Sequence, residues 1–329
     1  NGLIDRLGTT GRFHTLLHNT KTYGAWIEHF QLYNATSYQS TYHSKIRVSV
    51  FNGDHSNPSW TFVDGGGTPD QGGISYNQAS SSQINELFGP TLFSTAGTLY
   101  VSWIEKDYTS PVSPYYTQAG KYRVRVAAYN GSDTNPTWTL IDGNNNQGLN
   151  RTTNTALTMD HPQLGALNGK LYLVWTEMNS IAIPQIRMAV FNGNIQAPAW
   201  QYLDPGGESG FNRSAARAAR SPFLLSTSNA LIMTWWEPDI LSNTGKVRVA
   251  TYNGNDSAPA FNFIDGNTDA GISRFSSRTI NPLPSGYSGY PKLIVVNSKL
   301  YLSWTECEFM YGACYSPHQL SVARLISGP

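Results

Sequence analysis

The sequence predicts an all-β chain that forms a single domain over residues 1–329, a five-bladed β-propeller with four antiparallel strands per blade. An apolar strand ending in Trp-x-Glu occurs five times, about 70 residues apart, which is typical of radial β arrays. Charged residues make up only 13% of the chain, and it holds 30 glycines and 18 prolines. This composition favours short strands joined by turns over helices or disorder.

Each repeat can be divided into the same parts. The Trp-x-Glu strands span 23–28, 100–105, 172–177, 232–237 and 301–306. A second strand follows each of them at 46–51, 125–129, 186–191, 247–252 and, in divergent form, 320–325. Four copies then turn at Asn-Gly, which tolerates positive φ, and continue into a third strand that ends in Asp. The fourth strand of each blade precedes the Trp-x-Glu strand.

Residue size suggests a pairing register for the central hairpin. With Glu177 opposite Arg187, Trp175 faces Ala189, so that a large indole meets a small partner. The same rule predicts the pairs Trp26–Ser49, Trp103–Ala127, Trp235–Ala250 and Trp304–Ala323. The fifth copy lacks a last strand, and within residues 2–5 the tripeptide Leu3-Ile4-Asp5 matches 140–142, so we expect an N-terminal strand to close the C-terminal blade.

Candidate ligand-binding residues lie on the rim that carries the long, unequal loops, because variable loops on a rigid scaffold usually bind ligands. Aromatic rings can stack on sugars and Arg can hydrogen-bond hydroxyls or acids. The candidates are Trp236, Tyr76, Arg151, Arg213, Arg274 and Glu306. Two alternatives stay open: the repeated Gly-x-Asn/Ser-Arg loops could instead cap loops and tie blades together, and Trp236 could be a packing residue.

A Glu and an Arg recur at the ends of the paired strands. We interpret them as structural cross-strand salt bridges: Glu28–Arg47, Glu105–Arg125, Glu177–Arg187 and Glu237–Arg248. Five equivalent carboxylates could also be acids, bases or ligands, but catalysis needs carboxylates in different environments. Glu306 is the asymmetric copy, because Ser321 replaces its Arg.

The two cysteines, Cys307 and Cys314, predict a disulfide that clips one loop in an oxidising compartment; two reduced thiols are the alternative. Their spacing is a poor zinc site, and we expect no metal and no cofactor. The net charge of +1 gives no basis for nucleic-acid binding, and the apolar runs are too short for membrane insertion. The start of the chain indicates a mature form or a fragment of a longer protein.

The repeat unit resembles propeller-like repeats of large secreted and surface-anchored bacterial proteins. The residues that carry the resemblance are 170–177, 186–193 and 198–204, and it spans essentially the whole chain. More distantly, the chain is similar to propeller lectins and to sialidases. Its segment 132–138 loosely resembles the Asp-box motif of sialidases. The sialidase arginine signature is absent. The resemblance implies an extracellular or cell-surface location and no agreed activity.

From these observations we expect a non-enzymatic extracellular binding module that recognises a glycan or a surface protein through its long-loop face. The chain carries no catalytic motif of the kinds that sequence alone reveals. One alternative is a structural subunit that binds neighbouring subunits of a surface assembly or filament. A second alternative is a glycosidase.

Overall fold

The computed structural model describes residues 13–34, 39–66, 72–75, 87–107, 121–143, 148–151, 162–205, 209–212, 216–238, 245–266, 271–272, 278–279, 291–310, 313–314 and 319–325. The chain divides into two compact units. Unit 1 holds residues 1–164 and 191–200, and unit 2 holds residues 165–190 and 201–329. That all 329 residues form one domain stays a prediction.

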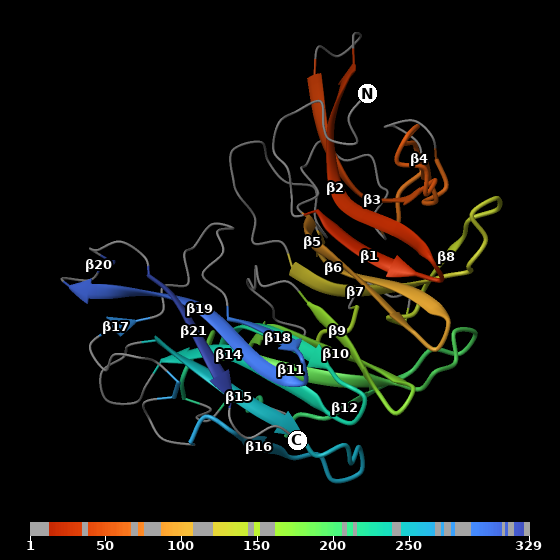
Figure 1. The fold of residues 1–329 in the computed structure, drawn as a ribbon. Coiled ribbons are helices and arrows are strands. Elements are labelled where there is room, and N and C mark those ends of the chain that lie inside the picture. Colours follow the sequence, from red (N-terminus) through yellow and green to blue (C-terminus); the bar gives the residue numbers. More distant parts are fainter. Residues whose placement is uncertain are drawn as a thin grey trace. The chain divides into compact units, whose positions relative to one another are not determined.

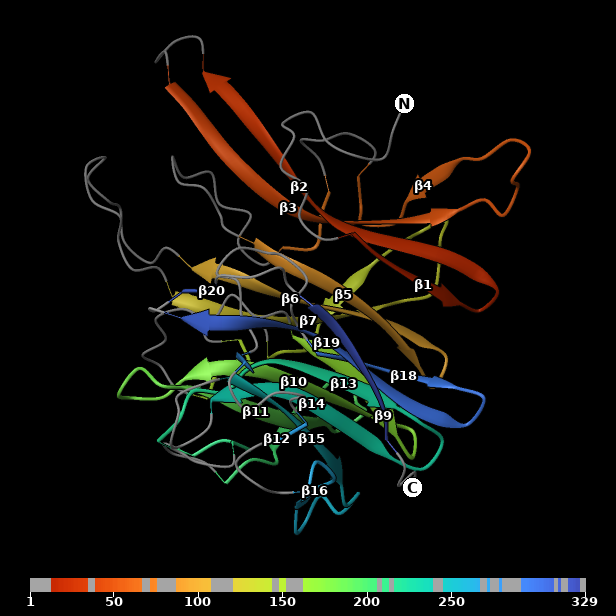
Figure 2. The same cartoon turned by 60° about the vertical axis from the view of Figure 1, so that its left-hand side comes forward.

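The first two sheets, blades one and two, belong to unit 1 (Figure 1). Each is antiparallel, and its strands follow one another in chain order. Blade one consists of β1 (His14–His18), β2 (Lys21–Asn34), β3 (Gln39–Phe51) and β4 (Trp60–Phe62). Blade two consists of β5 (Leu87–Thr95), β6 (Thr98–Asp107), β7 (Lys121–Tyr129) and β8 (Trp138–Leu140). In blade one, β2 and β3 form a long hairpin that extends past β1 and β4 (Figure 2).

Three further antiparallel sheets follow along the chain. Blade three consists of β9 (Gln163–Leu167), β10 (Lys170–Met178), β11 (Pro184–Phe191) and β12 (Trp200–Tyr202). Blade four consists of β13 (Arg220–Ser226), β14 (Leu231–Pro238), β15 (Gly245–Tyr252) and β16 (Phe261–Phe263). Blade five consists of β17 (Arg278–Thr279), β18 (Lys292–Val296), β19 (Lys299–Met310), β20 (Ala313–Cys314) and β21 (Gln319–Leu325).

These five sheets confirm the predicted fold class, an all-β chain whose repeats are the blades of a β-propeller. Blades one to four have the predicted four strands, with the strand that precedes Trp-x-Glu at one edge. In blade five, β18, β19 and β21 correspond to the first three strands of the other blades. The predicted closing strand, residues 2–5, lies outside the described residues.

The predicted register of the central hairpin is wrong by two residues. Trp175 lies opposite Arg187, and Ala189 lies opposite Leu173. The same shift appears in the pairs Trp26–Arg47, Trp103–Arg125, Trp235–Arg248 and Trp304–Ser321. The reason is that each Arg in blades one to four reaches a carboxylate on the next strand, so it need not lie opposite the Glu.

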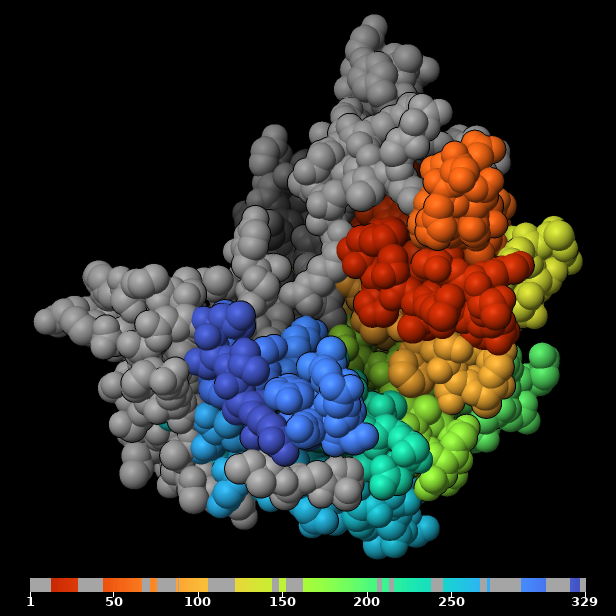
Figure 3. All heavy atoms as spheres, viewed as in Figure 1, coloured from red at the N-terminus to blue at the C-terminus, as the bar shows by residue number. Residues whose placement is uncertain are grey.

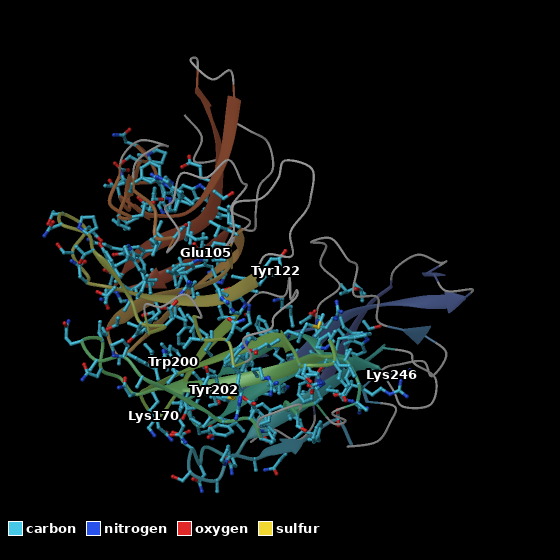
Figure 4. All side chains as sticks on the ribbon, turned by 180° about the vertical axis from the view of Figure 1, so that it is seen from behind. Glu105, Tyr122, Lys170, Trp200, Tyr202 and Lys246 are labelled. Atoms are coloured by element: carbon cyan, nitrogen blue, oxygen red, sulfur yellow. The ribbon has the colours of Figure 1, made fainter. Side chains whose placement is uncertain are left out.

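The turns that follow the second hairpin strand are built as the Asn-Gly pairs predict. Gly53, Gly131, Gly193 and Gly254 have φ between 73° and 81°. In each turn the Asn side chain folds back and donates to a backbone carbonyl five residues ahead, at 2.8–2.9 Å. These turns lie on one rim of the blades, the short-turn rim. The loops that join the two strands of each central hairpin, such as the β2–β3 loop, lie on the opposite rim, the long-loop rim. In unit 2, Lys170 lies at the short-turn end of blade three, and Lys246 lies at the long-loop end of blade four (Figure 4).

Candidate functional site

Four buried arginine–aspartate pairs fix the outer strands of blades one to four. Each Arg lies on the second strand of the central hairpin, which is β3, β7, β11 or β15. Each Asp comes 17 residues later, just after the short outer strand. The pairs are Arg47–Asp64 at 3.0 Å, Arg125–Asp142 at 3.1 Å, Arg187–Asp204 at 2.9 Å and Arg248–Asp265 at 3.5 Å. All four carboxylates are fully buried, so these pairs are scaffold.

The glutamate of Trp-x-Glu has a common partner in blades two to four. The indole Nε1 donates to the carboxylate two residues ahead, at 2.9–3.1 Å, in Trp103–Glu105, Trp175–Glu177 and Trp235–Glu237. These three glutamates are almost completely buried. In Figure 4, Glu105 lies at the end of β6, beside Tyr122 at the start of β7. A buried carboxylate that accepts this bond has a structural role.

Blade one departs from this arrangement. Glu28 Oε2 lies 3.4 Å from Arg47 Nε, the same nitrogen that lies 3.0 Å from Asp64 Oδ2. This confirms the predicted Glu28–Arg47 contact. The buried Nε1 of Trp26 has no hydrogen-bond partner among the described residues. The side chain of Glu28 is 15% exposed, whereas Asp64 is fully buried. Two carboxylates in different environments therefore share one guanidinium, near the middle of β2.

Burial raises the pKa of Asp64 to about 6, and the nearby charge of Glu28 adds to the rise. The charge of Arg47 and the N–H groups of Val48 and Gly66 oppose this rise. Arg47 itself is held by a bond to the carbonyl of Gly66, at 2.9 Å, and by the ring of Phe62, 4.4 Å from the guanidinium carbon. The site therefore combines a buried carboxyl that titrates near neutral pH with a carboxylate that reaches solvent.

The raised pKa of Asp64 predicts how stability depends on pH. Because the folded value lies near 6 and the unfolded value near 3.8, the contribution of Asp64 is fully present below about pH 3.8. It is lost as the pH rises through about 6. We therefore expect the stability deficit of Asp64→Asn relative to the parent to shrink between pH 4 and 6, by at most about 1.4 kcal/mol per pH unit.

Urea unfolding at pH 4, 5, 6 and 7 measures this deficit. Asp204→Asn is the matched control, because it removes the same kind of buried pair from blade three. The deficit of Asp64→Asn should change more across the window than that of the control. Equal pH profiles for the two variants would contradict the assignment.

The structure places only some of the predicted ligand residues. Arg151 follows the loop before blade three and is half-buried. Trp236 is half-buried on β14 and packs so closely on Gly245 of β15 that a Cβ there would meet its Nε1 at 1.6 Å. Tyr76, Arg213 and Arg274, and the side chain of Glu306, lie outside what the structure describes.

The repeated loop motif has a backbone role where it is described. The Asn150 side chain accepts from the N–H of Val124 at 2.8 Å, and Asn212 accepts from Ile186 at 2.9 Å. The hydroxyl of Ser75 accepts from Ile46 in the same way, at 3.2 Å. The third residue of the motif therefore bonds the loop to the second hairpin strand of its own blade, which is β3, β7 or β11. This supports the capping alternative over a ligand role for these three residues.

Among the described residues, no group of three His, Cys, Asp or Glu side chains is placed to bind a metal ion. No helix in the described part of the chain is long and apolar enough to span a membrane.

No protein family and no curated protein matches the sequence. Solved structures do match. An exo-1,5-α-L-arabinanase from a bovine ruminal metagenomic library is 11% identical, with 96% of this chain and 92% of that chain covered and a TM-score of 0.41. An α-L-arabinanase of Cellvibrio cellulosa is 12% identical, with 95% and 90% covered and a TM-score of 0.43. A thermostable family-43 glycoside hydrolase is 12% identical, with 96% and 89% covered and a TM-score of 0.43.

These matches correct two expectations from the sequence. The chain was expected to be a non-enzymatic binding module and not an enzyme, and the similar structures are glycoside hydrolases. The resemblance to propellers holds at the level of fold, while these matches do not support a specific likeness to lectins or sialidases. They assign no substrate and no catalytic residue to this chain, so its activity is argued below from its own residues.

Proposed function

We propose that this protein is a glycosidase and that Glu28 is a catalytic carboxylate. One observation carries the proposal: of the four described Trp-x-Glu carboxylates, Glu28 alone is partly exposed, and it lies 3.4 Å from the arginine that also holds Asp64, whose pKa is raised. Hydrolysis of a glycosidic bond uses carboxylates whose environments set different protonation states. Blades two to four hold the matching Glu in a buried bond to Trp.

The environment of Glu28 suits a base. A guanidinium within contact distance favours an ionised carboxylate, and the exposed side of Glu28 can reach a water molecule at the anomeric carbon. In this step the carboxylate takes a proton from the water as the water oxygen bonds to the anomeric carbon. The glycosidic C–O bond breaks, and the departing oxygen takes a proton from a second water molecule. Asp64 and Arg47 are positioning residues, because both are fully buried and act through Glu28.

The test is hydrolysis of a substrate panel by the parent and by Glu28→Gln. The panel contains arabinan, xylan and sucrose, with the nitrophenyl arabinofuranoside and xyloside for kinetics. We expect Glu28→Gln to lower kcat by a factor of about 10²–10⁴, the usual contribution of a general base. Its melting temperature should stay near that of the parent, because the side chain is partly exposed.

Glu177→Gln is the matched control. It changes the equivalent residue of blade three, whose carboxylate accepts from Trp175 and is buried. It should lower stability and leave the kcat of the folded protein unchanged. The proposal fails if the parent hydrolyses no member of the panel, or if Glu28→Gln retains the parental kcat.

Two expectations from the sequence remain proposals. Cys307 and Cys314 lie on the paired strands β19 and β20, where Cys314 is opposite Phe309. We retain the disulfide between them as a proposal, since their side chains lie outside what the structure describes. We also propose an extracellular or cell-surface location and a glycan as the substrate. We expect the protein neither to bind nucleic acid nor to insert into a membrane.

A further inference from the structure

A groove of about 560 Å³ lies on the short-turn rim of unit 1, at the start of β2, whereas Glu28 lies in the middle of that strand. Blade one supplies the turn before β2, the turn after β3 and Thr61 of β4; the β7–β8 loop of blade two supplies Asp133 and Thr134. In Figure 3 these two loops form the orange and yellow surfaces at one edge of unit 1. The volume falls within the range of small-molecule sites, about 300–1,000 Å³.

Asp133 anchors the groove by crossing from blade two to blade one. Its Oδ1 accepts from the hydroxyls of Tyr23 and Tyr129, both at 2.9 Å, and its Oδ2 lies 2.5 Å from Lys21 Nζ. Burial alone would raise the pKa of Asp133, but these hydrogen bonds and the charge of Lys21 lower it. Since a carboxylate oxygen has two lone pairs and an ammonium has three N–H donors, Oδ2 and Nζ each keep capacity for a ligand.

Unit 2 repeats this cluster but closes the space beside it. Asp256 binds Tyr172 at 3.0 Å, Tyr252 at 2.8 Å and Lys170 at 2.6 Å. There, Gln201 Nε2 also donates to the backbone carbonyl of Asp256, at 2.7 Å. Thr61 occupies the equivalent position in blade one, directly after the Trp of the outer strand, and is too short for this bridge. The cluster is therefore scaffold in both units, and the groove beside it in unit 1 lacks the bridge that Gln201 makes in unit 2.

The lining points to an uncharged ligand rich in hydroxyl groups. Lys21 and Asp133 neutralise each other, so a charged ligand would have to compete with an existing ion pair. Side by side, the ammonium donor and the carboxylate acceptor match two neighbouring hydroxyls. Thr20 and Thr61 add further hydroxyl partners.

One side of the groove is aromatic. The ring of His55 lies 5.2 Å from that of Phe51, which in turn lies 5.3 Å from Trp60. Such rings offer an apolar face to the C–H groups of a sugar. We propose that this groove binds a neutral saccharide, as a second site separate from the one at Glu28. This inference goes beyond the proposed hydrolysis and does not depend on it.

The test follows the imidazole resonance of His55, an exposed groove residue, assigned with His55→Gln. The probes are the neutral trisaccharides arabinotriose, xylotriose and cellotriose, and the acidic trigalacturonate. We expect a saturable shift with at least one neutral probe in the parent. Thr61→Gln, which supplies the side chain that closes this space in unit 2, should weaken that binding at least tenfold.

Two variants should bind as the parent does. Thr139→Gln makes the same substitution at the equivalent position of blade two, outside the groove. Glu28→Gln alters the proposed catalytic site, so binding that survives in it separates this inference from the hydrolysis. The proposal is overturned if no neutral probe shifts His55, if Thr61→Gln binds with parental affinity, or if trigalacturonate binds more tightly than the neutral probes.

Discussion

Replacement of Trp175 by alanine is expected to cost about 3–5 kcal/mol of the free energy of unfolding, because it removes a fully buried indole from a packed sheet. The indole also donates to Glu177 at 2.9 Å, so its loss removes a hydrogen bond from a buried carboxylate. Chemical denaturation of the parent and variant measures this cost. A loss below about 1 kcal/mol would mean that Trp175 does not pack as the structure shows.

A matched pair of milder variants separates packing from hydrogen bonding. Trp175→Phe and Trp26→Phe make the same change in blades three and one, but only the Nε1 of Trp175 has a partner among the described residues. A hydrogen bond to a charged group is worth about 1.5–3 kcal/mol. Trp175→Phe should therefore cost more than Trp26→Phe by about that amount. Equal costs would contradict the difference between the two blades on which the Glu28 site depends.

The blades could be predicted from the sequence because each repeat contains the local patterns that are typical of its own strands and turns. Alternating apolar strands, Asn-Gly turns and a constant order of parts leave few topologies. The register could not be predicted from the criteria we applied, since size matching allows more than one solution for a Trp. Pairing Glu177 with Arg187 by charge chose the wrong solution, because the guanidinium of Arg187 reaches past its own strand to Asp204.

A signal for the correct partner is present in the sequence. Each of these Arg residues precedes an Asp by 17 positions in all four blades, whereas the spacing from Glu to Arg varies with the loop between them. A fixed separation indicates two groups held by one rigid unit. The variable separation spans a loop, so it carries less information about contact.

The Glu28 site is harder to predict, because the tripeptide Trp26-Ile27-Glu28 is identical to Trp103-Ile104-Glu105. One local difference is Gly24, where the other copies have Val101, Leu173, Met233 or Leu302. Without a Cβ at Gly24, the ring of Phe13 fits where that atom would lie, at 2.7 Å, and also packs on Trp26. This packing involves Phe13, which precedes β1, and no spacing within the motif reveals it.

Loss of Arg187 is expected to destabilise the protein by about 3–5 kcal/mol, because Asp204 would remain fully buried without its cation. Arg187 also donates to the carbonyl of Ser209 at 2.7 Å, so it joins the outer strand and the following loop to β11. Arg187→Met keeps the length of the side chain and removes the charge. Thermal and urea unfolding measure the loss.

The double variant Arg187→Met/Asp204→Asn decides between two explanations of that loss. If the cost arises from an uncompensated buried charge, neutralising Asp204 should recover part of it, and the double variant should be more stable than the sum of the single losses predicts. If the cost arises only from packing around β12, the two losses should add. Since the carboxylates of all four Arg–Asp pairs are fully buried, we expect recovery, with an interaction energy of at least about 1 kcal/mol. Such a result would show that the pairs act as neutral units that hold each outer strand.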